Sequence, residues 1–438
     1  MSTPEGFLER TFKLRENNTT VRTEVLAGIT TFMTMGYIIF VNPAILSAAG
    51  MDFGAVLVAT CLVSAVGSLL MAFLANYPIA IAPGMGLNAF FAYTVVTQMG
   101  FSWQAALAAV FVSGCIFVLL TLTKVREALV NAIPVSLKMA ISAGIGLFIA
   151  LIGLANAGIV VSNPNTLVQF GDLHQPSVIL AILGLVITLG LVALRIKGAL
   201  LLGIIITTVI GIPMGVTKVE GLKLVSLPPS LAPTFGAFTV GFGELVGAGI
   251  ITVLFTLTFV DLFDTMGTLI GVSSKAGFLD EKGHLPRGGR ALLADALATV
   301  TAGVLGSSTA TSYIESASGI TEGGRTGLTS AVVALLFLAA LFISPLVGIV
   351  PAAATAPVLI IVGIFMMEPI MKIDFSNFLE AAPAFFAVVM MPFTYNIAEG
   401  IIWGILAYVL LHVVTGNARK ITPTLWVLTV ILLLRHFF

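Results

Sequence analysis

The sequence contains little charge, and this shortage excludes an ordinary soluble protein. Lysine, arginine, aspartate and glutamate make up 9% of the 438 residues, whereas about a quarter of the residues are charged in typical soluble domains. Cysteine and histidine are scarce as well. Cys61 and Cys115 lie inside apolar runs, which favours buried thiols over a disulfide or a metal site. The four histidines show no metal-ligand spacing, so we expect no metal and no other cofactor.

Several familiar signals are also missing. The first 24 residues carry charges of both signs and lack the short apolar core and small-residue cleavage site of a signal peptide. We expect them to form a cytoplasmic leader, residues 1–24, with a surface helix. The chain has no Walker loop, so ATP hydrolysis is not indicated as an energy source. No feature of the sequence indicates a nucleic-acid partner.

Apolar sequence is abundant. Hydrophobic residues make up 58% of the chain, the mean hydropathy is +1.11, and apolar runs recur along its whole length. Runs of roughly 20 residues predict an all-α polytopic membrane protein in a lipid bilayer, rather than a barrel of short alternating strands. The expected spans are residues 25–48, 54–76, 81–97, 103–122, 134–155, 177–194, 198–215, 246–273, 290–307, 311–320, 327–347, 354–371, 377–395 and 396–415.

These fourteen transmembrane segments fall into two sets of seven. The first set occupies residues 25–215, a polar connection occupies 216–243, and the second set occupies 244–415. The tail, 416–438, holds the apolar run Leu425–Leu434, which is short for a span and could be an interfacial or partial helix. With the N-terminus in the cytoplasm, 17 of the 20 lysines and arginines fall on the cytoplasmic side, as the positive-inside rule requires.

Spans three and ten are unusual. The stretch Ile79–Phe91 runs into span three and Gly306–Gly319 runs into span ten, and both are rich in glycine, proline or small polar residues. Paired interruptions at corresponding places in two halves indicate a transporter site built on broken helices. Because seven is an odd number, the two sets would insert in opposite orientations, which predicts a 7+7 inverted repeat. The N-terminal ends of the two half-helices would then offer backbone N–H groups to a ligand near the membrane centre.

An internal match supports this pairing of the two halves. The tripeptide Thr-Met-Gly at residues 34–36, in the first span, recurs 231 positions later at residues 265–267, in the eighth. The same offset carries Gly84 of span three onto Glu315 of span ten. The shared offset favours a repeat over chance similarity of three residues.

Acidic residues at membrane depth are the main functional candidates, because an ionisable side chain there is expensive. Asp261 and Asp264 lie in span eight, Asp295 in span nine and Glu315 in span ten. A carboxyl group accepts hydrogen bonds when ionised and can donate one when protonated, which suits a ligand rich in N–H groups and ring nitrogens. Such groups can also pick up and release protons, and so couple a proton gradient to transport.

Structural interpretations of these side chains stay open. Asp261 and Asp264 could form a structural pair bonded to neighbouring Ser or Thr, and Glu315 could merely cap its half-helix. Asp295 could be a structural lock or part of a proton path, and Asn88 could face the same cavity or make a structural hydrogen bond. The acids close to span ends, which are more often solvated or structural, are Glu244 and Glu399. The aromatic residues that could stack on a planar ligand, or else face lipid or the core, are Phe32, Phe90, Phe91, Phe259 and Phe263.

The chain resembles the AzgA-like branch of the nucleobase-cation symporters, which are purine permeases related to the uracil and xanthine permeases. The resemblance covers nearly the whole chain. The stretches that carry it are Thr20–Phe32, Ala82–Phe91, Leu262–Val272, Tyr313–Ser316, Gly323–Leu328 and Met390–Thr394. Two of these stretches, 82–91 and 390–394, look most similar to adenine permeases, and hypoxanthine/guanine permeases share much of the same sequence.

The resemblance implies a fold and a site. The fold would comprise a core domain of spans one to four and eight to eleven and a gate domain of spans five to seven and twelve to fourteen, dimeric through the gate. The base would bind between spans three, eight and ten. Asp264 and Glu315 match the family's carboxylates in spans eight and ten, while Asn88 and Asp295 match polar positions of spans three and nine. Thr268 stands where the uracil-type permeases have a histidine.

These observations together predict a transporter rather than an enzyme. We expect a proton-coupled symporter of the bacterial inner membrane that imports purine bases, with adenine favoured and a hypoxanthine/guanine permease as the alternative. Asp264 and Glu315 would hold the base, and Asp295 would join them in proton coupling. The other expected contacts with the base are Gly84, Met85, Gly86, Asn88, Phe263 and Ile314.

Two other classes of protein compete with this prediction. An anion transporter could use the same inverted-repeat architecture, but its site would want neutral or cationic helix ends rather than the acid Glu315. An intramembrane aspartyl protease would need two aspartates on separate facing helices, whereas Asp261 and Asp264 share one expected helix.

Overall fold

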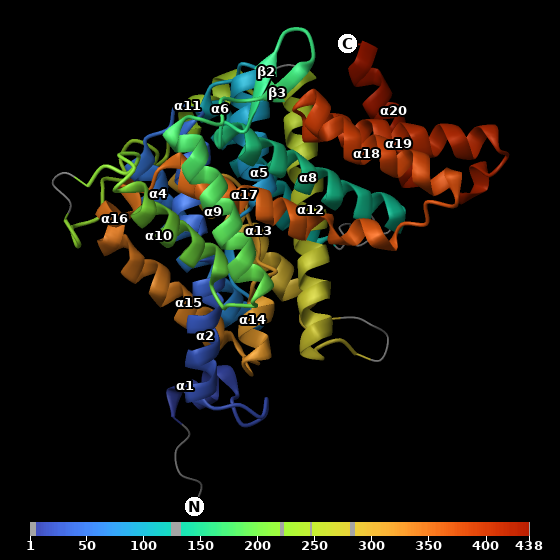
Figure 1. The fold of residues 1–438 in the computed structure, drawn as a ribbon. Coiled ribbons are helices and arrows are strands. Elements are labelled where there is room, and N and C mark those ends of the chain that lie inside the picture. Colours follow the sequence, from blue (N-terminus) through green and yellow to red (C-terminus); the bar gives the residue numbers. More distant parts are fainter. Residues whose placement is uncertain (1–5, 124–132, 220–222, 246–247, 281–284, 438) are drawn as a thin grey trace, which may run out of the picture.

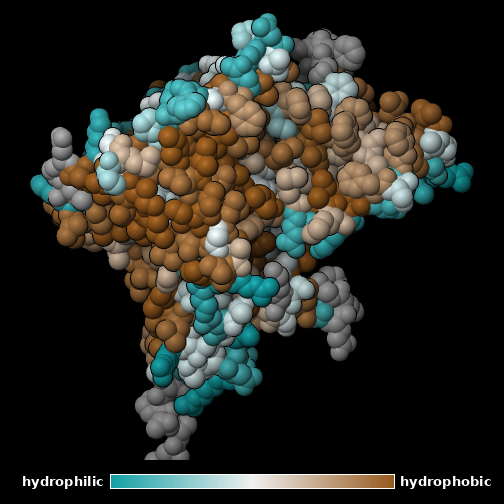
Figure 2. Space-filling view, in the orientation of Figure 1, coloured by the Kyte–Doolittle hydropathy of each residue, from teal (hydrophilic) through white to brown (hydrophobic). Residues whose placement is uncertain are grey.

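The chain folds into a multi-pass helical membrane protein in this computed structural model (Figure 1). The structure describes residues 6–123, 133–219, 223–245, 248–280 and 285–437. Over these residues, ten helices are long and apolar enough to cross a membrane: Val21–Ser47, Phe53–Ala75, Trp103–Leu122, Val135–Asn156, Pro176–Ala193, Thr252–Ser274, Gly288–Leu305, Gly327–Gly348, Ala352–Lys372 and Ile397–Val414. Two shorter apolar helices cover Ala199–Gly211 and Phe378–Thr394. Figure 2 shows apolar side chains over the broad middle of the molecule, with hydrophilic ends above and below.

The first half of the chain contains three of the four strands and both π-helices of the described residues. In order, its elements are α1 (Phe7–Phe12), α2 (Val21–Met35), α3 (Ile38–Ser47), α4 (Phe53–Leu70), the π-helix η1 (Met71–Ala75), β1 (Ile81–Pro83), α5 (Met85–Ala89), the π-helix η2 (Phe90–Gln98), α6 (Trp103–Leu122), α8 (Val135–Asn156), β2 (Val160–Asn163), β3 (Leu167–Phe170), α9 (Pro176–Ala193) and α10 (Ala199–Gly211). Strands β2 and β3 form an antiparallel hairpin at the top of Figure 1.

The second half begins after the connection. In order, its elements are α11 (Phe238–Gly241), η3 (Phe242–Glu244), α12 (Ala248–Ala276), α13 (Gly288–Leu305), β4 (Ala310–Ser312), α14 (Ser316–Thr321), α15 (Gly327–Ala340), η4 (Leu341–Ile343), α16 (Ser344–Gly348), α17 (Ala352–Met367), η5 (Glu368–Lys372), α18 (Phe378–Thr394), α19 (Ile397–Val414), η6 (Ala418–Lys420) and α20 (Pro423–Phe437). Helix α20 covers the apolar run of the expected tail and packs on α19.

Short polar residues mark where several long helices begin. The side chain of Asp52 accepts a hydrogen bond from Ala55 N at 2.7 Å at the start of α4, and Ser102 accepts one from Ala105 N at 3.1 Å at the start of α6. Such caps satisfy backbone N–H groups that a helix leaves unpaired at its first turn. Thr20 caps α2 in the same way, so this helix begins inside the expected leader rather than after it.

The two segments expected as spans three and ten contain no membrane-length helix. Each has instead a short buried strand followed by a short helix, and the strands β1 and β4 pair with each other in antiparallel fashion. The paired residues are Ile81 with Ser312, Ala82 with Thr311 and Pro83 with Ala310. Beyond the ladder, Gly84 N donates to Thr309 O and Tyr313 N donates to Ala80 O, both at 2.9 Å. Inside a membrane, extended backbone is tolerated only where its polar groups find protein partners, and each strand supplies them to the other.

The long helices form two groups according to their contacts. In one group, α2, α4, α6, α12, α13 and α15 pack around the two strands; in the other, α8 packs against α17, α18 and α19, while α9 packs against α10 and α17. The groups meet where α2 contacts α10, α3 contacts α17, α5 contacts α8 and α12 contacts α19. The paired strands therefore lie within one group, close to its boundary with the other.

A buried acid at the start of α2 escaped the sequence analysis. Glu24 is fully buried, and its carboxyl group accepts hydrogen bonds from Arg325 N at 2.8 Å and from the Thr329 hydroxyl at 2.6 Å. It also accepts bonds from Thr326 N and Thr329 N. These donors surround the first turn of α15, so a side chain 301 residues away in sequence serves as the cap of that helix.

This contact makes a prediction about stability. Replacing Glu24 by Ala leaves the donors at the start of α15 buried without an acceptor, which we expect to cost about 2 to 3 kcal/mol. Thermal unfolding of the purified protein in detergent measures the loss. Glu16→Ala serves as the control, because Glu16 pairs only with Lys13 on an exposed surface. Equal melting temperatures for the two variants would contradict the role of Glu24.

Candidate functional site

The two carboxylates expected to bind a ligand come together in the structure. Asp264 lies in the middle of α12, and Glu315 lies at the N-terminal end of α14. Asp264 interacts electrostatically with both Glu315 and Asp295. Three acidic side chains from three different segments thus share one buried region. Asp261, one turn before Asp264 on α12, is buried and accepts a hydrogen bond from Thr299 at 3.4 Å.

Glu315 has a partner that the sequence analysis missed. The Tyr37 hydroxyl donates a hydrogen bond to Glu315 Oε1 at 2.5 Å. Tyr37 is 1% exposed and lies at the break between α2 and α3. The side chain of Glu315 makes no capping bond to α14, so the alternative that it merely caps its half-helix finds no support in its contacts. The signal was available in the sequence, because Tyr37 directly follows the Thr-Met-Gly tripeptide of residues 34–36.

Helix α14 is held closely against α2. The hydroxyls of Thr34 and Ser318 lie 2.9 Å apart, and the Thr34 hydroxyl also reaches the carbonyl of Glu315 at 3.4 Å. A Cβ atom on Gly319 would lie 2.6 Å from the carbonyl oxygen of Ala27 and would meet the hydroxyl of Thr31. Only glycine permits this approach, which sets the position of Glu315.

The pairing of β1 with β4 uses one of the backbone N–H groups that we expected to face a ligand. The N–H group of Gly84 donates to Thr309 O, so it is already used. Glycine is required here and at Gly86, because an added Cβ would lie 2.7 Å from Cγ2 of Thr311 at Gly84 and 2.5 Å from Cγ2 of Ile145 at Gly86. Met85 between them is 7% exposed, whereas Ile314, next to Glu315, is 55% exposed. Of the expected backbone contacts, Ile314 is therefore the one in open surroundings.

Asn88 joins the two interrupted segments. It is fully buried on α5, and its Oδ1 accepts a hydrogen bond from the hydroxyl of Ser308, which precedes β4. Its Nδ2 has no hydrogen-bond partner among the residues that the structure describes. The contact with Ser308 fits the structural interpretation of Asn88, while the amide nitrogen remains available.

Asp295 is bonded on both of its oxygens. Oδ2 accepts from the Thr265 hydroxyl at 2.7 Å and Oδ1 accepts from the Ser312 hydroxyl at 3.1 Å. The hydroxyls of Thr265 and Thr311 also lie 3.2 Å apart. Asp295 on α13 thus ties α12 to strand β4. These contacts fit a structural lock, which was one of the two interpretations left open for this residue.

The aromatic candidates mostly pack against the protein itself. Phe90 and Phe91 are buried in the core. Phe32 contacts Phe337 edge to face, with ring centroids 5.1 Å apart, and Phe259 stacks on Phe255 at 4.2 Å. The side chain of Phe263 lies outside the described part of the chain. The described contacts therefore assign no ring to a stacking role.

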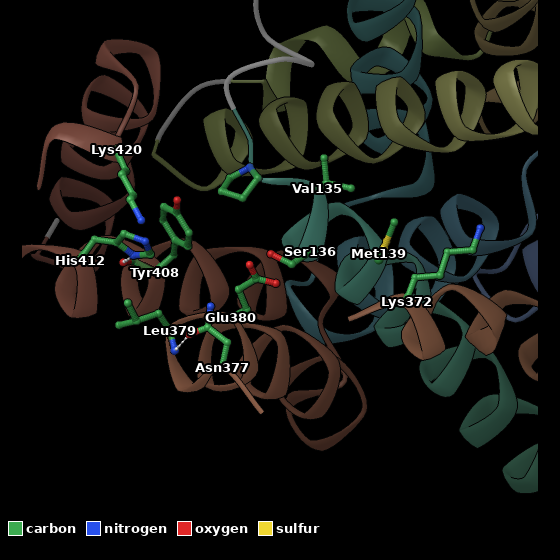
Figure 3. Close-up of a pocket in the computed structure, with 11 residues that line it drawn as sticks. Val135, Ser136, Met139, Lys372, Asn377, Leu379, Glu380, Tyr408, His412 and Lys420 are labelled. Carbon is green, nitrogen blue, oxygen red and sulfur yellow. Dashed lines mark hydrogen bonds between the residues drawn. The ribbon is translucent and has the colours of Figure 1, made fainter. Parts of the chain in front are cut away.

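One cavity lies away from Asp264 and Glu315. A space of about 300 Å³ opens between the start of α8, η5, α18 and the end of α19, where Glu380, Tyr408, His412 and Lys420 surround it (Figure 3). Its lining contains charges of both signs and none of the expected site residues. Asp264 and Glu315 remain the candidate site, because ionisable side chains within apolar spans are by default functional candidates.

The contacts of Asp295 generate a test of its role. Asp295→Ala leaves the buried hydroxyls of Thr265 and Ser312 without their acceptor, so we expect a loss of about 2 kcal/mol in stability. Asp295→Asn retains an acceptor oxygen and should lose less. Thermal unfolding of each variant, with the exposed Glu368→Ala as control, measures the difference. Unchanged stability in Asp295→Ala would remove the structural lock and favour the proton path.

Comparisons with known proteins identify the family of the chain. The chain matches a family model described as the permease family over residues 22–403. It is 47% identical to the adenine permease AdeP of Escherichia coli (strain K12), with 99% of this chain and 97% of that protein aligned. It is 46% identical to the guanine/hypoxanthine permease PbuG of Bacillus subtilis (strain 168), with 98% of this chain and 99% of that protein aligned.

A solved structure shows the same fold. The chain resembles the transmembrane domain of a cyanobacterium bicarbonate transporter, BicA, with a TM-score of 0.65 at 16% sequence identity. The likeness covers 86% of this chain and 97% of that one. At so low an identity it shows the arrangement of the helices alone.

Proposed function

The chain belongs to the permease family of nucleobase transporters, and on that premise we propose that it imports purine bases together with protons. The observation that carries the proposal is the convergence of Asp264 and Glu315 in the membrane interior, with the Tyr37 hydroxyl on the second of them. Proteins of this family are permeases and not enzymes. We further propose that the chain lies in a bacterial inner membrane with its N-terminus in the cytoplasm, as the distribution of lysine and arginine indicates.

The chemistry of the site suits the N–H-rich edge of a purine. Each carboxyl group accepts hydrogen bonds through two oxygens. Glu315 Oε1 accepts one from Tyr37, and the carboxyl group also interacts with its own backbone N–H. Each carboxyl oxygen has two lone pairs, so Glu315 retains capacity for a ring or exocyclic N–H group, and Asp264, bonded to Thr311, supplies a second acceptor. The Nδ2 of Asn88 and the backbone at Met85 and Gly86 complete the proposed set of polar contacts, and Ile314 forms its open side.

The same pair of acids accounts for proton coupling. Two negative charges repel strongly where little water screens them. A proton on Asp264 or Glu315 would relieve the repulsion between the two carboxylates. A base that binds the protonated pair carries the proton with it. Asp295 is the third acid in electrostatic contact with Asp264, and we retain it as a candidate for passing the proton onward.

Fewer observations bear on which purine the protein prefers. The stretches at residues 82–91 and 390–394 favour adenine. The relatives named for adenine and for guanine and hypoxanthine are 47% and 46% identical to this chain, a difference too small to separate them. We propose adenine as the favoured base, with a guanine/hypoxanthine permease as the alternative.

The strand register supports the proposed inverted repeat of fourteen spans. Ile81 pairs with Ser312, and these two residues are 231 positions apart, which is the offset between the two Thr-Met-Gly tripeptides. Gly84 precedes α5 and Glu315 precedes α14 at the same offset. An antiparallel pair of strands has a local two-fold axis through its paired residues, so this register is the one that an inverted repeat requires.

The two groups of helices fit a core domain and a gate domain. The group around the strands corresponds to spans one to four and eight to eleven, and the group around α8 and α17 corresponds to the rest. Movement of one group against the other would open the site to alternate sides. Helices α18 and α19 expose large apolar side chains such as Phe385 and Trp403, which is consistent with a homodimer formed through the gate.

The competing functions fit the site less well. An anion would meet two acids at Asp264 and Glu315, so the shared fold with a bicarbonate transporter does not extend to its substrate. A protease dyad would need its aspartates to face each other from two helices, whereas Asp261 and Asp264 share α12 and Asp261 contacts Thr299.

Uptake of radiolabelled adenine tests the proposed function. Asp264→Asn and Glu315→Gln should each lower uptake at least about tenfold, because a hydrogen bond to a charged group is worth about 1.5 to 3 kcal/mol. The control is Glu16→Gln, which makes the same chemical change on an exposed residue of the leader. Uptake unchanged in both site variants would rule out this assignment of the site.

The same assay separates the finer points. A protonophore should abolish accumulation if uptake is driven by protons. Competition by unlabelled adenine, guanine, hypoxanthine, xanthine and uracil ranks the substrates, and stronger competition by guanine and hypoxanthine than by adenine would select the alternative permease.

An ion pair between the two groups of helices yields a further prediction. Lys197, just before α10, pairs with Glu322 at the end of α14, and thus links the proposed gate to the segment that carries Glu315. Charge reversal by Lys197→Glu or Glu322→Lys should lower uptake about fivefold, since an exposed pair is worth up to about 1 kcal/mol.

The double variant Lys197→Glu/Glu322→Lys restores opposite charges and should recover most of the uptake. Lys13→Glu, which reverses a charge that pairs with Glu16 within the leader, is the control. If the double variant is as impaired as the worse single variant, the ion pair does not couple the two groups.

A further inference from the structure

The Tyr37 hydroxyl donates to Glu315, one of the two acids expected to bind substrate, whereas Asp264 interacts with the side chain of Thr311. Tyr37 lies in the short gap between α2 and α3, where Gly36 ends the first of these helices. Its ring is buried in the core and its oxygen lies 2.5 Å from Glu315 Oε1. It also interacts electrostatically with Asp264 and Tyr313. A residue of the first span therefore reaches the acid of the tenth.

This contact makes the two oxygens of Glu315 unequal. A phenol has a single O–H donor, and here that donor is directed at Oε1. Hydrogen bonds to a carboxylate are short and about twice as strong as those between neutral groups. Oε1 is thus held in one place, and the rotation of the carboxyl group that would exchange Oε1 with Oε2 is opposed.

A second buried tyrosine, Tyr313, has a different hydrogen-bond partner. Tyr313, two residues before Glu315, donates its hydroxyl hydrogen bond to Pro83 O at 2.5 Å. It ties the residue after β4 to the last residue of β1, and it donates to no carboxylate among the described contacts. The two tyrosines share burial, and Tyr313 also lies in electrostatic contact with Glu315 and Asp264. Removing one hydroxyl or the other therefore separates an effect on Glu315 from a general effect of losing a buried hydroxyl beside the site.

We propose that Tyr37 is a positioning residue, which holds Glu315 Oε1 so that Oε2 alone meets the N–H edge of the bound base. The proposal rests on the proposed function for the identity of the ligand, but the hydrogen bond to Glu315 stands without it. The position also links the first span to the site. Thr34, one turn earlier on α2, contacts Ser318 on α14. Helix α2 thus contacts α14 itself, and Tyr37, just after α2, contacts the carboxyl group of Glu315 at the start of α14.

The first measurement needs no ligand. Infrared difference spectra of the purified protein identify the carboxyl band of Glu315 as the one missing in Glu315→Gln. In Tyr37→Phe, which keeps the ring and removes the O–H donor, this band should shift. It should stay in place in Tyr77→Phe, which removes another buried tyrosine hydroxyl, one that accepts from Arg287 N away from the acids. An unshifted band in Tyr37→Phe would overturn the proposal.

The second measurement is equilibrium binding of labelled adenine to the same samples. We expect Tyr37→Phe to weaken binding about tenfold, the effect of losing a hydrogen bond to a charged group. In a Glu315→Gln background the same change should have little further effect, because Tyr37 acts through Glu315. Tyr313→Phe should add its effect in full in that background. Equal loss from Tyr37→Phe in both backgrounds would indicate a structural role and overturn the proposal.

The outcomes distinguish this inference from the proposed function. If the wild-type protein binds no purine while the Glu315 band still shifts in Tyr37→Phe, the proposed function fails and the hydrogen bond remains. If the wild type binds adenine and Tyr37→Phe binds it equally well, the positioning role fails and the proposed function remains. Should Tyr37→Phe not fold, 3-fluorotyrosine at position 37 keeps the ring and strengthens the donor, and must shift the band and tighten binding.

Discussion

The antiparallel pairing of β1 with β4 is the interaction on which the rest of the site depends. Extended backbone cannot lie in a membrane unless its N–H and C=O groups are satisfied by protein. Here each of two interrupted segments satisfies the other, at Ile81 with Ser312 and at the flanking bonds of Gly84 and Tyr313. Because the strands are antiparallel, α5 and α14 leave the pair at its opposite ends, and α14, which follows Glu315, packs against α12.

The acids of the site are kept at membrane depth by hydroxyl groups. Asp295 is bonded to Thr265 and Ser312, and Glu315 is bonded to Tyr37. A buried polar group without a partner costs more free energy than a hydrogen bond contributes, so these donors offset much of the cost of burial. The two acids differ in their hydrogen bonds. Asp295 accepts from side-chain hydroxyls on both oxygens, whereas the hydroxyl of Tyr37 donates to one oxygen of Glu315.

Fold and substrate separate in this protein. The arrangement of helices resembles that of a bicarbonate transporter at 16% identity, while sequence relatives at 46% and 47% identity are named for purine bases. Architecture is set by the apolar surfaces of the helices, which many sequences can supply. In the proposed site, a few side chains beside the two paired strands would select the ligand, and acids at those positions would favour a ligand with N–H groups over an anion.

The amino-acid sequence by itself determined a helical membrane protein, its family and the acids worth studying, because long apolar runs and isolated carboxylates are local features that composition and spacing display. It even contained the offset of 231 positions that the register of Ile81 and Ser312 repeats. Only the tertiary structure showed that Tyr37 donates to Glu315, that Glu24 caps α15, and that Gly84 has already used its N–H group. Each of these contacts joins residues more than two hundred positions apart, and no local pattern in the chain encodes which distant donor a buried acceptor will meet.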